Sequence, residues 1–354
     1  MDSVQAFEAQ RPHLLALAYR MLGDIGRAED VVQDAWFRWQ QHAEIVETPR
    51  AFLVKVVARL CLNELSSARA RREEARGDRL PEPVDLNETA IGRIESIDRI
   101  SMAFLVLLQR LTPAERAALL LHEVYDFEHR EISTLLNRSE AACRQLVARA
   151  RAHVAVEPAT VVESQEEHSR LLRAFADALA GGDHRRLLAM LAGDATAVID
   201  AGPNGARLGR IRNVGRPVVG ARRIAALLGA VSRAGLPGAI TECELNGAPA
   251  LVRRVDGVAV SAITVVISGG LIERMFIQID AARLGHLGRD RSPISHASTS
   301  RLGAVPGPLP EEAPVGAVPG AEDEHVATTH DLVQPRRPGR RDVAVHVDRG
   351  PWPH

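Results

Sequence analysis

Arginine and glutamine side chains between residues 138 and 153 have the donor chemistry that reads DNA. This segment carries four arginines, one glutamine and one acid, a local charge of +3 in a chain of 354 residues whose formal net charge is −1. Arginine pairs with two acceptors of guanine and glutamine pairs with adenine, while further arginines bind phosphates. The segment therefore predicts a DNA-contacting element. The plain alternative is a solvated helix with ordinary surface arginines.

Two short helices must hold these side chains. The run Glu131–Leu136 predicts a first helix, and Asn137 tolerates the left-handed backbone of a tight turn. Ser139 is a good N-cap for a second helix, whose apolar residues face inward. This is the pattern of a helix-turn-helix, whose second helix enters the major groove. The residues expected to contact DNA are Ser139, Arg144, Gln145, Arg149 and Arg151.

A second basic segment spans residues 50–76, with seven basic residues and three acids, a local charge of +4. Thr48-Pro49 opens a helix there, because a proline at a helix start loses no hydrogen bond. The apolar spacing predicts that this helix continues to Arg72. A basic helix end binds phosphates with salt-dependent affinity, but the charges alone do not separate this function from a solvated face.

Acids and aromatic rings share one short helix at residues 28–39, with the sequence Ala-Glu-Asp-Val-Val-Gln-Asp-Ala-Trp-Phe-Arg-Trp. Trp and Phe are strong anchors at protein interfaces, so this segment suits docking on a partner protein. The alternative is that Trp36 and Trp39 belong to the core.

Residues 165–284 follow a different pattern, with helices first and strands after. The strands are joined by turn signals that favour hairpins, Asn246-Gly247, Asp256-Gly257 and Gly269-Gly270. This order predicts a compact α+β domain with antiparallel strands. Asp200, His184 and Asp280 are candidate acid–base residues for an enzyme here, but they form no convincing pair.

Composition marks the boundaries between these parts. Glycine, prolines and acids make residues 77–98 a polar linker. Residues 285–354 hold 10 prolines and 8 glycines and are expected to be a disordered tail. Three scattered cysteines predict neither a disulfide framework nor a metal site, and no cofactor is expected. With no signal peptide or membrane span expected, we predict a cytoplasmic protein.

Five motifs together resemble the extracytoplasmic-function sigma factors, the minimal sigma-70 type with domains 2 and 4. They are Asp-Val-Val-Gln-Asp-Ala-Trp at 30–36, Pro-Arg-Ala-Phe-Leu at 49–53, Arg-Leu-Cys-Leu-Asn at 59–63, Leu-Thr-Pro-Ala-Glu-Arg-Ala at 111–117, and Glu-Ile through Ala-Cys-Arg-Gln-Leu at 131–146. The resemblance covers about residues 5–155. Leu80-Pro81-Glu82-Pro83 and the strands to Ile279 further resemble the subgroup with a fused SnoaL-like domain.

The resemblance implies a multidomain fold class. All-α sigma domain 2 (1–76) and sigma domain 4 (99–156), the latter with the helix-turn-helix, flank the linker (77–98). An α+β SnoaL-like (cystatin-like) domain (165–284) and the disordered tail (285–354) follow.

The same resemblance implies an RNA polymerase sigma factor, not an enzyme, whose partners are promoter DNA and the β′ clamp and β flap of core polymerase. The implied clamp-binding residues are Asp30, Gln33, Asp34 and Phe37. The implied −10 contacts are Lys55, Arg59, Asn63, Arg69, Arg71 and Arg72, and the helix-turn-helix would read the −35 element. Leu80, Pro81, Glu82 and Pro83 would form an interdomain contact through which the fused domain modulates activity in cis.

Three segments depart from the subgroup's pattern. Arg79 stands where an aromatic residue usually precedes Leu-Pro-Glu-Pro, residues 200–207 replace a glycine-rich Asp-Gly-Gly-Gly-Lys segment, and residues 280–284 replace a terminal Asn-Pro-x-Lys-Leu motif. Two other functions stay open: a SnoaL-like enzyme, and a helix-turn-helix regulator whose SnoaL-like domain binds a small-molecule ligand. The second would leave the domain 2 motifs unexplained.

Overall fold

The computed structural model describes residues 3–67, 79–93, 100–155, 164–202, 207–208, 211–212 and 217–288. Its first part is a bundle of three helices, α1 (Ser3–Leu22), α2 (Ile25–His42) and α3 (Pro49–Ser66). Gly23, with φ +66°, ends α1, and the Asp24 side chain caps α2 by accepting from the Arg27 N–H. The basic helix was expected to reach Arg72, but Ser67 has an extended backbone and α3 ends at Ser66.

Four helices form the second part: α5 (Met102–Gln109), α6 (Pro113–Glu123), α7 (His129–Leu136) and α8 (Glu140–Ala155). Two 3-10 turns, η1 (Leu86–Glu88) and η2 (Ala90–Arg93), precede them. A capping box between Thr112 and Glu115 starts α6. The two helical parts share one continuous apolar core.

The C-terminal domain begins with two helices, α9 (Gln165–Ala180) and α10 (His184–Ala189). The later elements are β1 (Leu191–Asp200), β2 (Arg207–Leu208), β3 (Ile211–Arg212), β4 (Val218–Val219), α11 (Ala221–Arg233), β5 (Ala239–Leu245), β6 (Ala248–Val255), β7 (Val258–Ser268), β8 (Leu271–Gln278) and η4 (Ala281–Arg283). Six strands form one sheet in the order β4-β1-β8-β7-β6-β5. The three predicted hairpins join β5 to β8, and both residues of each turn have positive φ. The sheet is mixed, however, because β1 runs parallel to β8.

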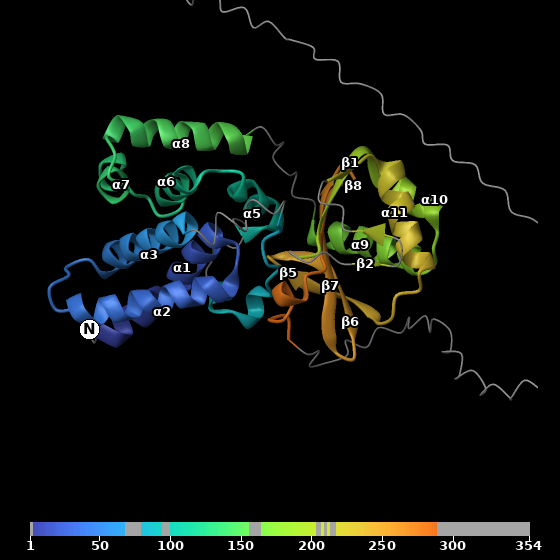
Figure 1. Cartoon of the computed structure of the whole chain (residues 1–354), viewed down its shortest axis with the longest axis horizontal. Helices are drawn as coiled ribbons and strands as arrows, with labels where there is room; N and C mark the ends of the chain where they lie inside the picture. Colours follow the sequence, from blue (N-terminus) through green and yellow to red (C-terminus); the bar gives the residue numbers. More distant parts are fainter. Residues whose placement is uncertain are drawn as a thin grey trace, which may run out of the picture. The chain divides into compact units, whose positions relative to one another are not determined.

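The two faces of this sheet have different coverings. Helices α9, α10 and α11 pack on one face (Figure 1), around a core that includes Phe175, Ile224 and Met275. On the other face, Val266 and Phe276 contact Leu80 of the linker and Met102 of α5. The second sheet face is therefore in contact with the linker and with the second helical part.

Candidate nucleic-acid interface

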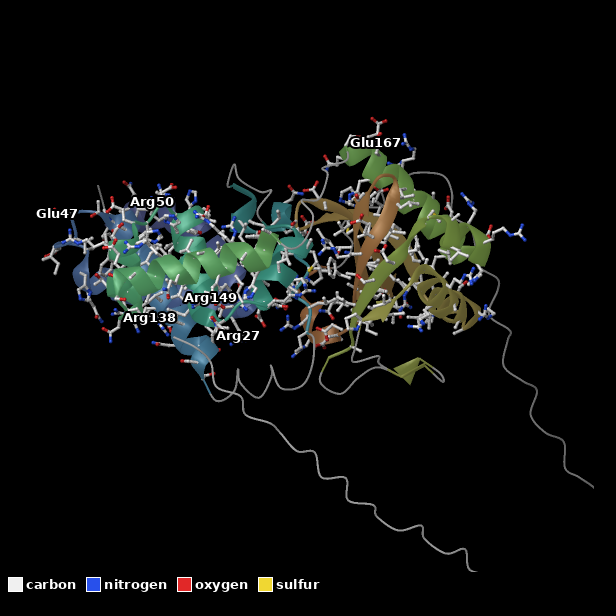
Figure 2. All side chains as sticks on the ribbon, turned by 90° about the horizontal axis from the view of Figure 1, so that it is seen from above. Arg27, Glu47, Arg50, Arg138, Arg149 and Glu167 are labelled. Carbon is white, nitrogen blue, oxygen red and sulfur yellow. The ribbon has the colours of Figure 1, made fainter. Side chains whose placement is uncertain are left out.

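Helices α7 and α8 form the predicted helix-turn-helix. Asn137 has φ +51°, which turns the chain between the two helices, and the Ser139 hydroxyl accepts from the Ala142 N–H at 3.2 Å. Cys143, Leu146, Val147 and Ala150 of α8 are buried. Arg144, Gln145, Arg149 and Arg151 are exposed on its outer side. Figure 2 labels Arg149 on α8 and Arg138 in the turn before this helix.

The arginines of α8 are paired with carboxylates. Arg144 pairs with Glu140 on the same helix, and Arg151 pairs with Glu123. Arg149 Nε lies 3.0 Å from Glu115 Oε1, whose side chain is buried. Burial acts to raise the pKa of Glu115, but hydrogen bonds from Arg149 and Thr112 outweigh it and hold this pKa below its usual value. Each of these three guanidinium groups therefore has a carboxylate partner in this structure.

The basic helix α3 faces the helix-turn-helix. Lys55 Nζ lies 3.1 Å from Glu131 Oε1 of α7 and 5.4 Å from the centre of the Phe127 ring. Arg59 and Asn63, also on α3, are exposed. Three further arginines of the predicted interface, Arg69, Arg71 and Arg72, lie outside the described residues.

The acid-and-aromatic helix α2 presents one polar stripe. Asp30, Gln33, Asp34 and Phe37 are all exposed, and their spacing of three and four residues places them on one helix face. The Phe37 side chain is the apolar member, with 52% of the residue surface exposed.

The two tryptophans of α2 belong to the core, as the alternative interpretation held. Trp39 is buried and donates from Nε1 to the Ser3 carbonyl oxygen at 2.8 Å, and Trp36 packs edge-on against Phe7.

The linker segment Leu80–Pro83 is buried between α1 and the C-terminal domain. The Glu82 N–H donates to the Gly23 carbonyl oxygen at 2.9 Å. The Tyr19 hydroxyl donates to the Glu82 carbonyl oxygen at 2.5 Å and accepts from Asn246 Nδ2 at 2.8 Å. Tyr19 thereby joins α1, the linker and the β5–β6 turn. We define the junction as the contacts that join Tyr19, Gly23 and the linker residues 80–84 to Asn246, Arg283 and His286.

Further contacts tie the linker to the C-terminal domain. The Asn246 N–H donates to the Val84 carbonyl oxygen at 2.8 Å, and the Val84 N–H donates to Asn246 Oδ1 at 3.2 Å. Arg283 Nη1 donates to the Leu80 carbonyl oxygen at 2.7 Å and to that of Gly23 at 3.3 Å. His286 Nε2 lies 2.6 Å from the Pro83 carbonyl oxygen. Two residues assigned to the tail from sequence are thus packed instead: His286 contacts the linker, and Leu287 is buried in an apolar cluster of the C-terminal domain.

The candidate acid–base residues have structural partners. Asp200 Oδ2 accepts from the Leu80 N–H at 3.0 Å and from Gln278 Nε2 at 3.3 Å, and Asp280 pairs with Arg79. His184 Nδ1 lies 3.2 Å from the Ala225 carbonyl oxygen. Both aspartates thus bind the linker rather than facing a substrate cavity as a pair.

An acidic cavity of ≈ 520 Å³ adjoins the junction. Its lining includes Asp24, Glu29, Glu82, Asp85, Glu88 and His286. Within the described ranges, no group of three or more His, Cys, Asp or Glu side chains is placed to hold a metal ion.

Four junction residues, Tyr19, Asn246, Arg283 and His286, were not foreseen as site residues from the sequence. Two of them had a local signal: Asn246 belongs to a predicted hairpin turn, and Arg283 lies in the segment that replaces the Asn-Pro-x-Lys-Leu motif. No helix among the described residues is long and apolar enough to cross a membrane.

Comparison with known proteins covers most of the chain. A sigma-70 region 2 family model matches residues 6–71, and a sigma-70 region 4 model matches residues 101–154. The chain is 34% identical over 278 residues to the ECF RNA polymerase sigma factor SigJ of Mycobacterium tuberculosis, which covers 73% of this chain and 87% of the relative. It is 30% identical over 291 residues to the probable ECF RNA polymerase sigma factor SigI of the same species, which covers 80% of this chain and 94% of the relative.

A solved structure extends the similarity beyond the helical part. The crystal structure of the M. tuberculosis extracytoplasmic function sigma factor SigJ superposes with a TM-score of 0.62 at 31% sequence identity. The match covers 79% of this chain and 97% of the solved one. Residues 1–155 are less than half of the chain, so the match includes the C-terminal domain.

Proposed function

The chain belongs to the extracytoplasmic-function sigma factors of RNA polymerase, and on that premise we propose that its fused SnoaL-like domain holds sigma domains 2 and 4 in a closed, inactive arrangement. As a sigma factor it directs promoter-specific initiation by RNA polymerase. The proposal has two parts: the surfaces that bind polymerase and promoter DNA, and the effect of the fused domain on those surfaces.

The surfaces follow from exposure and charge. The stripe of Asp30, Gln33, Asp34 and Phe37 suits the β′ clamp of core polymerase, because an exposed aromatic ring among acids is a good interface anchor. The outer side of α8 suits the −35 element, and α3 suits the −10 element. Phosphate contacts by the arginines would add affinity that falls with salt.

The main support for the closed arrangement is the contact between α3 and α7. The elements named −10 and −35 are about 25 base pairs apart, roughly 85 Å at ~3.4 Å per base pair. In this structure, however, Lys55 Nζ of the first domain lies 3.1 Å from Glu131 Oε1 of the second. A chain with these two helices in contact cannot bind both elements, so the domains must separate before a promoter is engaged.

The fused domain supplies contacts that oppose this separation. It binds α1 through Asn246 and Arg283, and α5 through Val266 and Phe276. Because the domain is covalently attached, its effective concentration is high and even modest contacts bias the equilibrium. We assign it no catalysis, since the carboxylates of Asp200 and Asp280 are occupied by the linker.

The test is transcription from a cognate promoter with purified core polymerase. Arg79→Ala removes the pair with Asp280 across the junction and should raise transcript yield severalfold. Arg173→Ala is the matched control, because Arg173 Nε pairs with Glu242 at 2.9 Å inside the C-terminal domain. Yield that stays unchanged or falls in folded Arg79→Ala protein would contradict the closed, inactive arrangement.

A further inference from the structure

The Glu82 carboxyl group is buried where three parts of the chain meet. Its side chain is 8% exposed, and Oε2 accepts from the Ile25 N–H at 2.6 Å. Oε1 lies 3.8 Å from Nδ1 of His286. The nearby Arg283 does not compensate it directly, because this guanidinium donates to the carbonyl oxygens of Leu80 and Gly23.

The tautomer of His286 follows from its other nitrogen. Nε2 lies 2.6 Å from the Pro83 carbonyl oxygen, which can only accept, so Nε2 carries a hydrogen. Nδ1 is buried and makes no hydrogen bond to any described residue. In the neutral ring this Nδ1 is an acceptor that faces a carboxylate, which is another acceptor. One proton held by the pair removes this conflict.

The surrounding groups are mostly acidic. Those that face the pair from the adjoining elements are Tyr19 of α1, Asp24 and Glu29 at the start of α2, Asp85 and Glu88 of the linker, and Asp280 and Arg283 near η4. Carboxylates in such a group repel one another, so a proton is the favoured countercharge where bulk water is limited.

We propose that Glu82 and His286 form a proton-dependent latch, in which Glu82 takes up a proton when the junction closes and the junction loosens as the pH rises through neutrality. This inference rests on the proposed closed arrangement and names a signal that regulates it.

The direction follows from linkage. Burial, and then the nearby Asp24 carboxylate, raise the pKa of Glu82 from 4.5 to about 7 in the closed chain. A group whose pKa is raised by closure stabilises the closed form at low pH, and this stabilisation is lost as the pH rises through the raised value. Burial lowers the pKa of His286 from 6.5, which has the opposite effect: its contribution to closure is lost as the pH falls below 6.5.

The two effects differ in size between pH 6 and pH 8. A Glu82 pKa of about 7 raises the ratio of open to closed chains about tenfold over this range. A His286 that is neutral when closed lowers the same ratio by at most about fourfold. The net expectation for the unmodified chain is therefore a rise of at least about twofold.

Variants separate these contributions with opposite signs. Glu82→Gln is isosteric and neutral, so only His286 titrates and the ratio should fall by up to about fourfold from pH 6 to pH 8. In His286→Gln the opposing effect is gone, and the ratio should rise about tenfold. The matched control is Glu166→Gln, which neutralises an exposed carboxylate of α9 that is not among the groups facing the pair, and it should keep the rise of the unmodified chain.

The measurement is single-molecule energy transfer in the full chain. Dyes are attached at cysteines that replace the exposed Gln41 of α2 and Arg233 of α11, in a Cys243→Ser background, since Cys61 and Cys143 are buried. The open and closed populations are counted at pH 6 and pH 8. This readout involves neither polymerase nor promoter, so it succeeds or fails independently of transcription.

The outcomes are distinct. An open-to-closed ratio that rises in the unmodified chain, rises more steeply in His286→Gln and falls in Glu82→Gln supports the latch. A flat or falling ratio in the unmodified chain, or the same rise in Glu82→Gln, overturns it. If Glu82→Gln does not fold, a rise in His286→Gln no steeper than in the unmodified chain overturns it. If junction variants open the chain while transcription stays constant, the proposed inhibition fails and the latch stands.

Discussion

Removing the Tyr19 hydroxyl should open the junction. This oxygen donates to the Glu82 carbonyl oxygen and accepts from Asn246 Nδ2, and the residue is fully buried. Tyr19→Phe keeps the ring and leaves two buried polar groups without their partner. Each such group costs about 1–3 kcal/mol, while in an open chain water can satisfy both.

The expected size is large enough to measure. If the two groups together cost about 2–6 kcal/mol, the open population rises roughly 30- to 20,000-fold. Hydrogen exchange reports this population directly, because an amide that is protected only in the closed form exchanges in proportion to its opening. Two amides report on the junction: Glu82 N–H, bonded to Gly23, and Asn246 N–H, bonded to Val84.

A matched control removes a hydroxyl elsewhere in the first helical part. The Ser66 hydroxyl donates to the Asn63 carbonyl oxygen at 2.9 Å at the end of α3. Ser66→Ala should leave exchange of the two junction amides unchanged. Exchange rates in folded Tyr19→Phe within about twofold of the parent at both amides would refute the argument that this hydroxyl joins the three parts.

Three further outcomes follow from the surfaces and the chain end. Asp34→Ala with Phe37→Ala should lower affinity for core polymerase by at least ~2 kcal/mol without changing the melting temperature, since both residues are exposed; equilibrium binding to core polymerase measures this. Arg144→Ala and Gln145→Ala should each reduce the free energy of binding by about 1–3 kcal/mol on the cognate −35 element only. Arg149→Ala should weaken binding to all DNA sequences alike and flatten the salt dependence of binding. Binding titrations on cognate and scrambled duplexes measure both effects. A chain ending at residue 288 should keep the junction amides protected, while one ending at residue 284 should lose protection because it lacks the packed His286 and Leu287.

Local features of the fold could be predicted from local sequence. Asn137 was expected to turn the chain between two helices, and it has the left-handed backbone required there. The three paired turn signals were expected to close hairpins, and each does so with two residues at positive φ. These features depend on the conformational preferences of one or two residues, and those preferences follow directly from the residue types.

Features that depend on distant partners could not be predicted in the same way. Nothing in the β1 sequence indicates that it pairs in parallel with β8, about 80 residues later along the chain. Helix α11 had a usable signal, the buried spacing of Ile224, Ala225 and Leu228, but lay between the segments assigned from sequence. The junction bonds join residues separated by 59 (Gly23 to Glu82) to 260 positions, and the identity of a single polar residue does not indicate such a distant partner.

The junction explains why two departures from the subgroup's pattern occur together in this chain. Arg79 stands where the pattern has an aromatic residue, and Asp280 opens the segment that replaces the terminal motif. These two side chains pair with each other, and the Asp200 carboxylate lies 3.8 Å from Arg79 Nε. Without Asp280, Arg79 would keep only the 3.8 Å contact with Asp200, and without Arg79 the partly buried Asp280 carboxylate would lose this ion pair. The ion pair across the junction therefore depends on both departures being present.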